Sequence, residues 1–153
     1  MINIVYYSPE LRVYRDGRVE RKWKRGGKWK IINNNANMET GYNHLKVDGK
    51  TTYRHRLIAF CFLDLPTILF DKINEIDHID RDPLNNSVEN LRIVSRQQNT
   101  WNTNSKGYYL DKRDGRFYSE IMVNHKKIHL GGFDTEEKAS EEYQKAKSIY
   151  HHI

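Results

Sequence analysis

Apolar residues occur in this sequence only in short runs, and this limits what the chain can fold into. The longest run is L-I-A-F-C-F-L at residues 57–63, and hydrophobic residues make up 37% of the 153 positions. That length fits one ordinary domain or two small ones, and the short runs argue against a single large core. No run approaches the roughly 18 apolar residues of a membrane-spanning helix, and the start lacks the basic head and apolar stretch of a signal peptide. We therefore predict a cytoplasmic protein with no membrane partner.

The first third of the chain is predicted to form β-hairpins. Residues 11–32 alternate apolar and charged side chains and contain turn signals at Asp16-Gly17 and Gly26-Gly27, which predicts two hairpin-like pairs of strands. A polar loop, N-N-N-A-N, follows at 33–37. A further hairpin is predicted to turn at Asp48-Gly49.

The apolar run is predicted to be a buried helix that begins at His55 and is ended by Pro66. We interpret His55 as a hydrogen-bonded structural residue that ties the helix to the next element, with a role as a ligand as the alternative. Cys61 is the only cysteine, so the chain has no intrachain disulfide and no cysteine-based zinc site. Free cysteine is among the most buried residue types, and Cys61 is therefore predicted to lie in the core.

Charged residues are unevenly distributed along the chain. Residues 1–56 hold 13 Lys/Arg and 5 Asp/Glu (net +8), residues 57–104 hold 4 and 7 (net −3), and residues 105–153 hold 9 and 8 (net +1). A basic first third beside an acidic middle predicts a polyanion-binding surface next to a cation-binding site.

Seven cations lie between residues 18 and 30, interrupted by a single acid, Glu20, and by Trp23 and Trp29. This density predicts contact with a DNA backbone, and a solvated strand face with two core tryptophans is the alternative. The residues predicted to contact DNA here are Arg18, Arg21, Lys22, Lys24, Arg25, Lys28 and Lys30.

The stretch from Glu75 to Asn104 concentrates the residues suited to chemistry. Residues 75–79 and 91–94 are predicted to be short strands, separated by a polar loop at 80–86. Ser95 and Gln98 form a capping-box signature, so a helix is predicted to begin there and to carry Asn99 in its first turn. Asp77 and His78 on the first strand can then converge with Asn99 on one small site.

These residue types suit metal-assisted hydrolysis of a phosphodiester. The reaction needs a base that activates water, a divalent cation and a duplex held in line. The carboxylate of Asp77 and the amide oxygen of Asn99 are ligands that a hard cation such as Mg²⁺ prefers. His78, with an ordinary pKa near ~6.5, is the natural base. Asp80 and Asp82 are interpreted as loop formers, and an influence on the metal's surroundings is the alternative.

The segments D-H-I-D, L-N-N, E-N-L-R and S-R-Q-Q-N, in this order, resemble the HNH endonuclease motif. The variant is that of phage and intron-encoded homing endonucleases, whose last motif position is Asn. Y-R-H-R-L-I-A-F-C-F resembles the lead-in helix of this group, and L-R-V-Y-R-D-G-R-V-E-R resembles its N-terminal strand module.

The resemblance implies an α+β protein with a ββα-metal (His-Me finger) nuclease core. His78 would be the general base, Asp77 and Asn99 would bind one divalent ion, Mg²⁺ or alternatively Mn²⁺, and Asn90 would join the two strands. It also implies hydrolysis of double-stranded DNA to 5′-phosphate and 3′-hydroxyl ends in the cytoplasm of a host bacterial cell. One active site cuts one strand, so a monomer would nick, and a double-strand break would need a homodimer or two visits.

The last third is predicted to form three short strands between residues 107 and 130, with turns at Asp114-Gly115 and Asn124-His125, followed by a helix. Asp134 and Glu137 resemble a capping box, and an apolar face is predicted on the helix. Strand alternation predicts that one sheet face packs on it. The helix face comprises Ala139, Tyr143, Ala146 and Tyr150, and the sheet face comprises Phe117, Ser119, Ile121 and Val123 with Ile128 and Leu130.

This segment resembles the ethylene-response-factor DNA-binding domain in G-Y-Y-L-D-K-R-D-G-R-F-Y-S-E-I and H-L-G-G-F-D-T-E-E-K-A. The resemblance implies that the exposed sheet face lies in the major groove, although Met122 and His129 depart from the Arg and Trp of the plant domains, so base preference does not transfer. The residues implied in DNA binding are Tyr109, Lys112, Arg113, Glu120, Met122, Lys127 and His129.

Three segments result: basic hairpins at 1–54, a nuclease core with its lead-in helix at 55–104, and a DNA-binding domain at 105–153. We predict a metal-dependent DNA endonuclease of the phage homing type. A DNA-binding regulator with a relic HNH scaffold is the alternative. An RNA-directed nuclease is disfavoured, because no RNA-recognition signature is visible.

Overall fold

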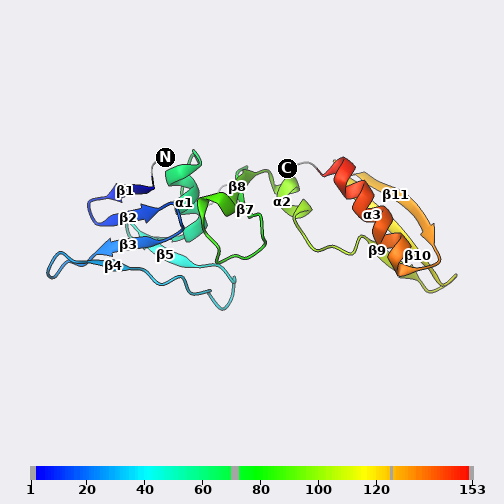
Figure 1. Ribbon diagram of the computed structural model, residues 1–153, viewed down its shortest axis with the longest axis horizontal. Helices are drawn as coiled ribbons and strands as arrows, with labels where there is room; N and C mark the ends of the chain where they lie inside the picture. Colours follow the sequence, from blue (N-terminus) through cyan, green and yellow to red (C-terminus); the bar gives the residue numbers. More distant parts are fainter. Residues whose placement is uncertain (1–2, 70–72, 125, 152–153) are drawn as a thin grey trace. The chain divides into compact units, whose positions relative to one another are not determined.

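The protein has mixed α and β structure with several small antiparallel sheets. The structure, a computed structural model, describes residues 3–69, 73–124 and 126–151. The chain divides into two compact units, unit 1 (Met1–Asn99) and unit 2 (Thr100–Ile153) (Figure 1).

Unit 1 begins with a four-stranded antiparallel sheet whose strands follow the order of the chain. The strands are β1 (Ile4–Ser8), β2 (Leu11–Tyr14), β3 (Val19–Lys22) and β4 (Trp29–Ile31). The turns predicted at Asp16-Gly17 and Gly26-Gly27 are confirmed, and the three glycines have positive φ. The alternating pattern does not predict β1, which pairs with β2.

A second hairpin leads into the buried helix. It consists of β5 (His44–Val47) and β6 (Lys50–Tyr53), and it turns at Asp48-Gly49 as predicted. The helix α1 (Arg54–Phe62) begins one residue before His55. It ends before Pro66, so the prediction that this proline ends it is wrong. Leu63 is the C-cap, and its backbone N donates to Ala59 O. Asp64, the next residue, has a left-handed φ of 58°, which turns the backbone out of the helix.

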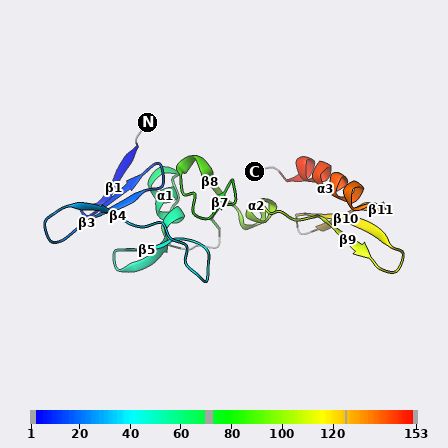
Figure 2. The same ribbon diagram turned by 60° about the horizontal axis from the view of Figure 1, so that its bottom comes forward.

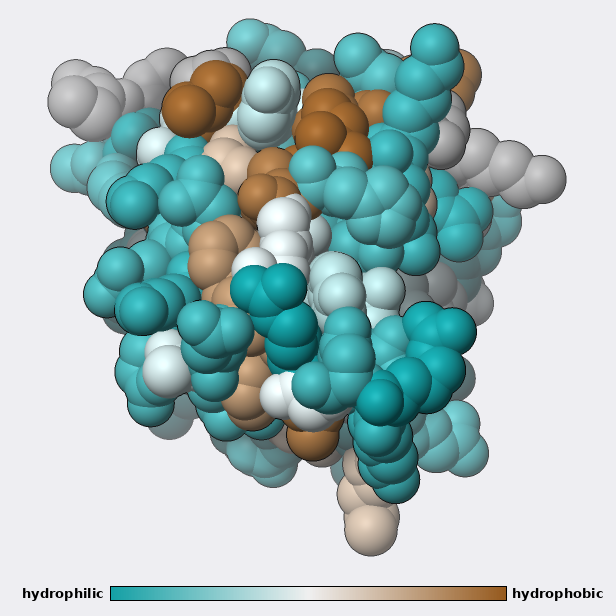
Figure 3. Space-filling view, turned by 90° about the vertical axis from the view of Figure 1, so that its right-hand side faces the viewer, coloured by the Kyte–Doolittle hydropathy of each residue, from teal (hydrophilic) through white to brown (hydrophobic). Residues whose placement is uncertain are grey.

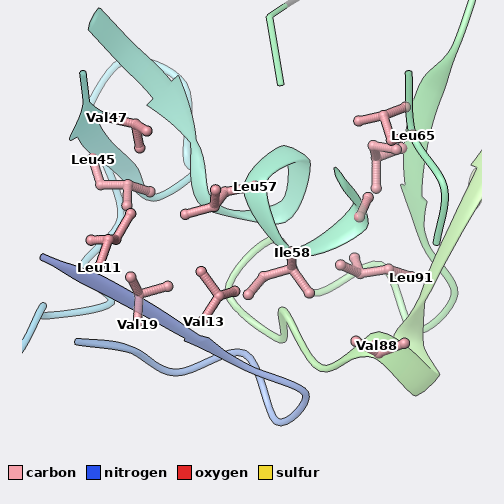
Figure 4. Packing of buried hydrophobic residues seen from close by; sticks show 12 residues of the cluster. Leu11, Val13, Val19, Leu45, Val47, Leu57, Ile58, Leu65, Val88 and Leu91 are labelled. Atoms are coloured by element: carbon pink, nitrogen blue, oxygen red, sulfur yellow. The ribbon is translucent and has the colours of Figure 1, made fainter. Parts of the chain in front are cut away.

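One hydrophobic core joins the first sheet, β5, α1 and the β7–β8 hairpin of unit 1. Leu57 and Ile58 of α1 are completely buried, between side chains of the first sheet, of β5 and of the segment near β8 (Figure 4). The core includes Leu11, Val13, Val19, Leu45, Val47, Leu57, Ile58, Val88 and Leu91. Cys61 is half-buried and packs against this core. The boundary predicted between residues 54 and 55 therefore lies inside a compact unit, because the segments on both sides share one core.

The central stretch forms the predicted strand, loop, strand and helix. The strands β7 (Glu75–His78) and β8 (Leu91–Val94) pair antiparallel, with a short 3₁₀ turn η1 (Val88–Asn90) before β8. The helix α2 (Arg96–Trp101) follows directly. The capping box is confirmed, because Ser95 Oγ accepts from Gln98 N at 3.3 Å and Gln98 Oε1 accepts from Ser95 N at 3.0 Å.

Arg54, the first residue of α1, is buried and joins several loops of unit 1. Its guanidinium donates to Asn43 Oδ1 at 2.8 Å and to the backbone carbonyls of Gly17 at 3.2 Å, Ile32 at 2.9 Å and Asn33 at 2.9 Å. Burial lowers the pKa of Arg54 to about 10, so the side chain stays charged at neutral pH. Its charge is therefore stabilised by carbonyl dipoles.

Unit 2 is a three-stranded antiparallel sheet with one helix along a face (Figures 1 and 2). Its elements are β9 (Tyr108–Asp111), β10 (Arg116–Val123), β11 (Lys126–Phe133) and α3 (Glu136–Tyr150), and the strand order is β11-β10-β9. The predicted packing face is confirmed by a core of Ile121, Tyr143 and Ala146 with Val123, Ile128 and Leu130 against it.

Three details of unit 2 differ from the prediction or lie outside the structure. The N-cap of α3 is Thr135, whose side chain accepts from Lys138 N, so the capping box at Asp134 and Glu137 is wrong by one residue. Tyr150 is exposed, because only the first three residues of the predicted face reach the sheet. His125 of the predicted turn lies outside the described residues.

The described helices include none that is long and apolar enough to cross a membrane. In the space-filling view, hydrophilic side chains surround narrow strips of hydrophobic ones (Figure 3).

Replacement of Arg54 by lysine is expected to destabilise unit 1. Arg54→Lys keeps the positive charge but loses the planar guanidinium with its several N–H donors. Buried carbonyls are then left without donors, and the free energy of unfolding should fall by about 3 kcal/mol. Arg25→Lys, the same change at an exposed turn position, should cost under about 0.5 kcal/mol. Urea unfolding followed by tryptophan fluorescence would measure both, and equal stability of the two variants would contradict this role for Arg54.

Candidate active site

His78 is the last residue of β7 and is 5% exposed. Its ring lies 5.2 Å from that of His55 and 5.9 Å from that of Tyr42, and its Nε2 lies 3.3 Å from Asn86 Oδ1. Burial lowers the pKa of His78, while Asn86 and the nearby carboxylates of Asp80 and Asp77 act in the opposite direction. The imidazole is therefore neutral at neutral pH, which is the form that a general base needs.

His55 packs directly against His78. Its ring stacks on Tyr53 at 5.2 Å and contacts the edge of Tyr42 at 5.1 Å. Burial lowers its pKa to about 3, and the neighbouring His78 adds to this effect. Its contacts with aromatic rings fit the structural interpretation. Among the residues that the structure describes, His55 is held by these ring contacts and not by the hydrogen bond that we expected.

Asp77 is buried beside a cation. Its Oδ2 accepts from Arg92 Nε at 2.8 Å and forms an ion pair with Arg92 Nη2 at 2.7 Å. Asp77 and Arg92 are partners in the register of β7 with β8, so the strand pairing itself sets this contact. Arg92 was not predicted as a site residue, because its partner comes from another strand.

Asn99 is placed on the same side of β7 as Asp77. Its Nδ2 donates to Glu75 Oε2 at 2.6 Å, and Glu75 and Asp77 lie two residues apart on the strand, which puts them on one face. Strand alternation could have identified Glu75, which the motif spacing does not include.

The oxygen donors at this face suit a hard divalent cation. Among the residues that the structure describes, no cluster of three or more His, Cys, Asp or Glu side chains could hold a metal ion. A site here depends on the Asp77 carboxylate and the Asn99 amide oxygen. Mg²⁺ typically binds one or two protein oxygens and completes its coordination with water and substrate phosphates. The chemistry of these side chains therefore fits the predicted ion.

Asn90 joins the ends of the loop between β7 and β8. Its Nδ2 donates to Asp80 Oδ1 and to Asn85 O, both at 2.8 Å, and its Oδ1 accepts from Asp80 N at 3.0 Å. Asp80 Oδ1 also accepts from Asp82 N at 2.8 Å, and Asp82 Oδ1 accepts from Leu84 N at 2.9 Å. These bonds fit the interpretation of both aspartates as loop formers.

The basic residues of the first sheet are mostly exposed. Arg21 differs, because its guanidinium donates to the carbonyl of Lys46. Trp23 is 53% exposed with Lys30 Nζ 4.6 Å from its ring, and the guanidinium of Arg12 lies 3.8 Å from the ring of Trp29. Neither tryptophan belongs to the hydrophobic core, so the alternative with two core tryptophans is wrong. The exposed cations are Arg18, Lys22, Lys24, Arg25, Lys28 and Lys30.

Four of the residues implied in DNA binding by unit 2 meet on one sheet face. Glu120 pairs with Lys127 Nζ at 2.7 Å and with His129 Nδ1 at 3.0 Å, and it accepts from the hydroxyl of Tyr109 at 3.3 Å. Lys127 lowers the pKa of Glu120, which is therefore ionised at neutral pH.

The other three residues lie around this group. Met122 is exposed on β10. Lys112 and Arg113 lie in the turn between β9 and β10, where Arg113 pairs with Asp111.

Comparisons with known proteins bear on the central segment. Residues 72–100 match the family model HNH_3, described as HNH endonuclease. The H-N-H endonuclease F-TflI of Escherichia phage T5 is 41% identical over 71 residues, covering 45% of this chain and 36% of that protein. The SPbeta prophage-derived YosQ of Bacillus subtilis (strain 168), whose name includes HNH homing endonuclease, is 41% identical over 61 residues, covering 39% of this chain and 32% of that protein.

A solved structure described as DNA binding and cleavage by the HNH homing endonuclease I-HmuI aligns with 94% of this chain and 82% of that chain. The TM-score is 0.49 and the sequence identity is 24%. The chain spans 36% and 32% of the length of the two curated relatives. The family model supports the HNH endonuclease family, a class of DNA-cleaving hydrolases, for residues 72–100, and the names of the two relatives agree with it.

Acidification is expected to destabilise unit 1 through His55. Its pKa is about 3 in the folded chain and about 6.5 when unfolded. Between these pH values His55 is protonated in the unfolded chain but not in the folded one. The contribution of neutral His55 to the free energy of unfolding is therefore complete above about pH 6.5 and is lost as the pH falls toward 3. The loss at pH 5 is about 2 kcal/mol.

The comparison is between the wild-type chain and His55→Phe, which keeps an aromatic ring in contact with Tyr53. Urea unfolding without metal at about pH 7 and pH 5 should show a pH dependence that is smaller in His55→Phe by about 2 kcal/mol. The same pH dependence in both chains would contradict the effect of burial on His55.

Proposed function

We propose that the chain is a metal-dependent endonuclease of the HNH homing type that hydrolyses phosphodiester bonds in duplex DNA. The observation that supports this most is the β7–β8 hairpin followed by α2, which brings Asn99 to the strand face of Asp77 next to the buried His78. The match of residues 72–100 to the family agrees with it. The β7–β8 hairpin with α2 would be the ββα-metal core.

His78 acts as the general base in this proposal. Neutral at physiological pH, it takes a proton from water, and the resulting hydroxide forms the new bond to phosphorus. The bond from phosphorus to the 3′ oxygen breaks, and that oxygen takes a proton from solvent, leaving a 3′-hydroxyl and a 5′-phosphate. The proton on His78 returns to solvent.

Asp77 and Asn99 would hold the divalent cation, Mg²⁺ or Mn²⁺, and Asn90 keeps the loop between β7 and β8 in place. When bound, the cation supplies charge stabilisation at the phosphoryl and leaving oxygens. Arg92 holds the Asp77 carboxylate in position through the pair across the strands.

Duplex DNA is the proposed partner of both units. The exposed cations of the first sheet contact its backbone, and the face of unit 2 with Tyr109, Lys127 and His129 lies in the major groove, as in the ethylene-response-factor domains. A monomer nicks, and a double-strand break requires a homodimer or a second visit. The proposed location is the cytoplasm of a host bacterial cell.

Cleavage of supercoiled plasmid DNA tests the reaction. The wild-type chain with Mg²⁺ or Mn²⁺ is expected to nick it, and His78→Ala should be slower by roughly 100-fold or more, because a general base contributes 10² to 10⁴ in rate. Gel shifts of His78→Ala in EDTA should match the wild type. If both proteins leave the plasmid supercoiled while shifting DNA, the chain is a DNA-binding protein with a relic scaffold. A preference for RNA would contradict the proposed substrate.

Removal of the Glu120 charge is expected to strengthen DNA binding by unit 2. Glu120→Gln releases Lys127 from its ion pair and removes the charged partner of His129, so at least one more cation, Lys127, can neutralise a phosphate. The slope of log affinity against log salt should steepen by roughly 0.9.

Glu141→Gln is the matched control, because it removes the same charge from the exposed surface of α3, on the other side of unit 2. Equal changes in the two variants would mean that only net charge matters, which would contradict a DNA-binding role for the sheet face.

A further inference from the structure

The side-chain amide of Asn86 has a defined orientation. Asn86 is 3% exposed, and its Nδ2 donates to Leu84 O at 3.0 Å and to Asn34 Oδ1 at 3.2 Å. A backbone carbonyl only accepts hydrogen bonds, so the group that faces Leu84 O is the NH₂ group. The oxygen of Asn86 is therefore the atom that lies 3.3 Å from Nε2 of His78.

The orientation of Asn86 determines where the hydrogen of neutral His78 lies. An amide oxygen accepts and cannot donate, so the imidazole nitrogen that faces it must carry the hydrogen. That nitrogen is Nε2, and the lone pair of the neutral ring is then on Nδ1.

Asn34 orients Asn86 from the other side. Asn34 Nδ2 donates to Leu84 O at 2.6 Å, the same carbonyl that Asn86 binds, so Asn34 must direct its Oδ1 toward the NH₂ group of Asn86. The side-chain amides of Asn34 and Asn86, which lie 52 residues apart in the sequence, thus orient each other around the carbonyl of Leu84.

The loop that carries Asn34 is held from inside unit 1. Asn33 O accepts from Arg54 Nη2 at 2.9 Å and from Asn43 Nδ2 at 3.2 Å, and Asn35 O accepts from the same Asn43 group at 2.7 Å. Both neighbours of Asn34 are therefore fixed by buried side chains.

The backbone of Asn86 is also held closely. A Cβ added at Gly17 would lie 2.7 Å from the carbonyl carbon of Asn86, so the hairpin turn between β2 and β3 rests directly on this residue. Val88 N donates to Arg15 O at 2.9 Å in the same turn.

We propose that Asn34 and Asn86 are positioning residues that keep neutral His78 in the tautomer with its hydrogen on Nε2. Nδ1 is then the nitrogen that takes the proton from water. The role of Nδ1 rests on the proposed function, whereas the tautomer is a property of the protein without DNA or metal.

The tautomer can be measured by ¹⁵N NMR of the histidine rings in the full chain, without DNA or metal, at about pH 8, where histidine is neutral. The His78 signals are assigned by their loss in His78→Ala. In the wild type, the His78 Nδ1 signal should have the shift of an unprotonated nitrogen and the Nε2 signal that of a protonated one. The opposite pattern would overturn the proposal on its own.

Two variants of Asn86 test the cause of this preference. Asn86→Ala removes the acceptor, so the shifts should move toward a mixture of tautomers, and kcat should fall roughly 10-fold at nearly constant KM. Asn86→Asp loses the NH₂ group that binds Leu84 O and Asn34 Oδ1 but keeps an acceptor oxygen for Nε2, so the Nε2 signal should remain that of a protonated nitrogen. Unchanged His78 shifts in Asn86→Ala would overturn the proposal.

Asn34→Ala should cause a smaller change in the same direction, since Asn86 keeps its bond to Leu84. Asn35→Ala, in the same loop with an exposed side chain, is the matched control and should leave the shifts unchanged. Equal effects of the two loop variants would contradict the role of Asn34. If the wild-type chain shows the predicted tautomer but does not cleave DNA, the proposed function fails and the positioning role stands.

Discussion

The buried guanidinium of Arg54 is the interaction on which much of unit 1 depends. A cation inside a protein must be compensated, and here the compensation comes from a side-chain amide and backbone carbonyls of two segments. The segments are the turn after β2 and the polar loop after β4. Because both segments contact the loop between β7 and β8, one buried charge fixes the surroundings of His78.

The site separates two electrostatic environments along one short strand. His78 lies among aromatic rings, where burial lowers its pKa and keeps it neutral. Asp77, one residue earlier, is next to the cation of Arg92, which compensates its charge. Aromatic packing around His78 and a cation beside Asp77 therefore occur at adjacent positions of β7.

Local signals in the sequence predict the helices, strands and turns. The contacts that hold the site together depend on residues far apart in the sequence. Asp-Gly and Gly-Gly pairs located the turns, and Ser95 with Gln98 located α2, because these preferences act within four residues. Asn34 and Asn86 could not be connected from sequence, since neither belongs to a periodic pattern and they lie 52 residues apart. Arg92 acts through the register of β7 with β8, which motif spacing does not show. The N-cap of α3 was misplaced because Asp134 and Thr135 are both good caps, and only the backbone selects between them.

In the proposed reaction, water attacks phosphorus and the 3′ oxygen leaves. Cleavage of a DNA duplex in H₂¹⁸O under single-turnover conditions, followed by mass spectrometry of the ends, tests this most directly. We expect one ¹⁸O atom in the new 5′-phosphate and none at the 3′-hydroxyl. A labelled 3′-phosphate, or products without the label, would contradict it.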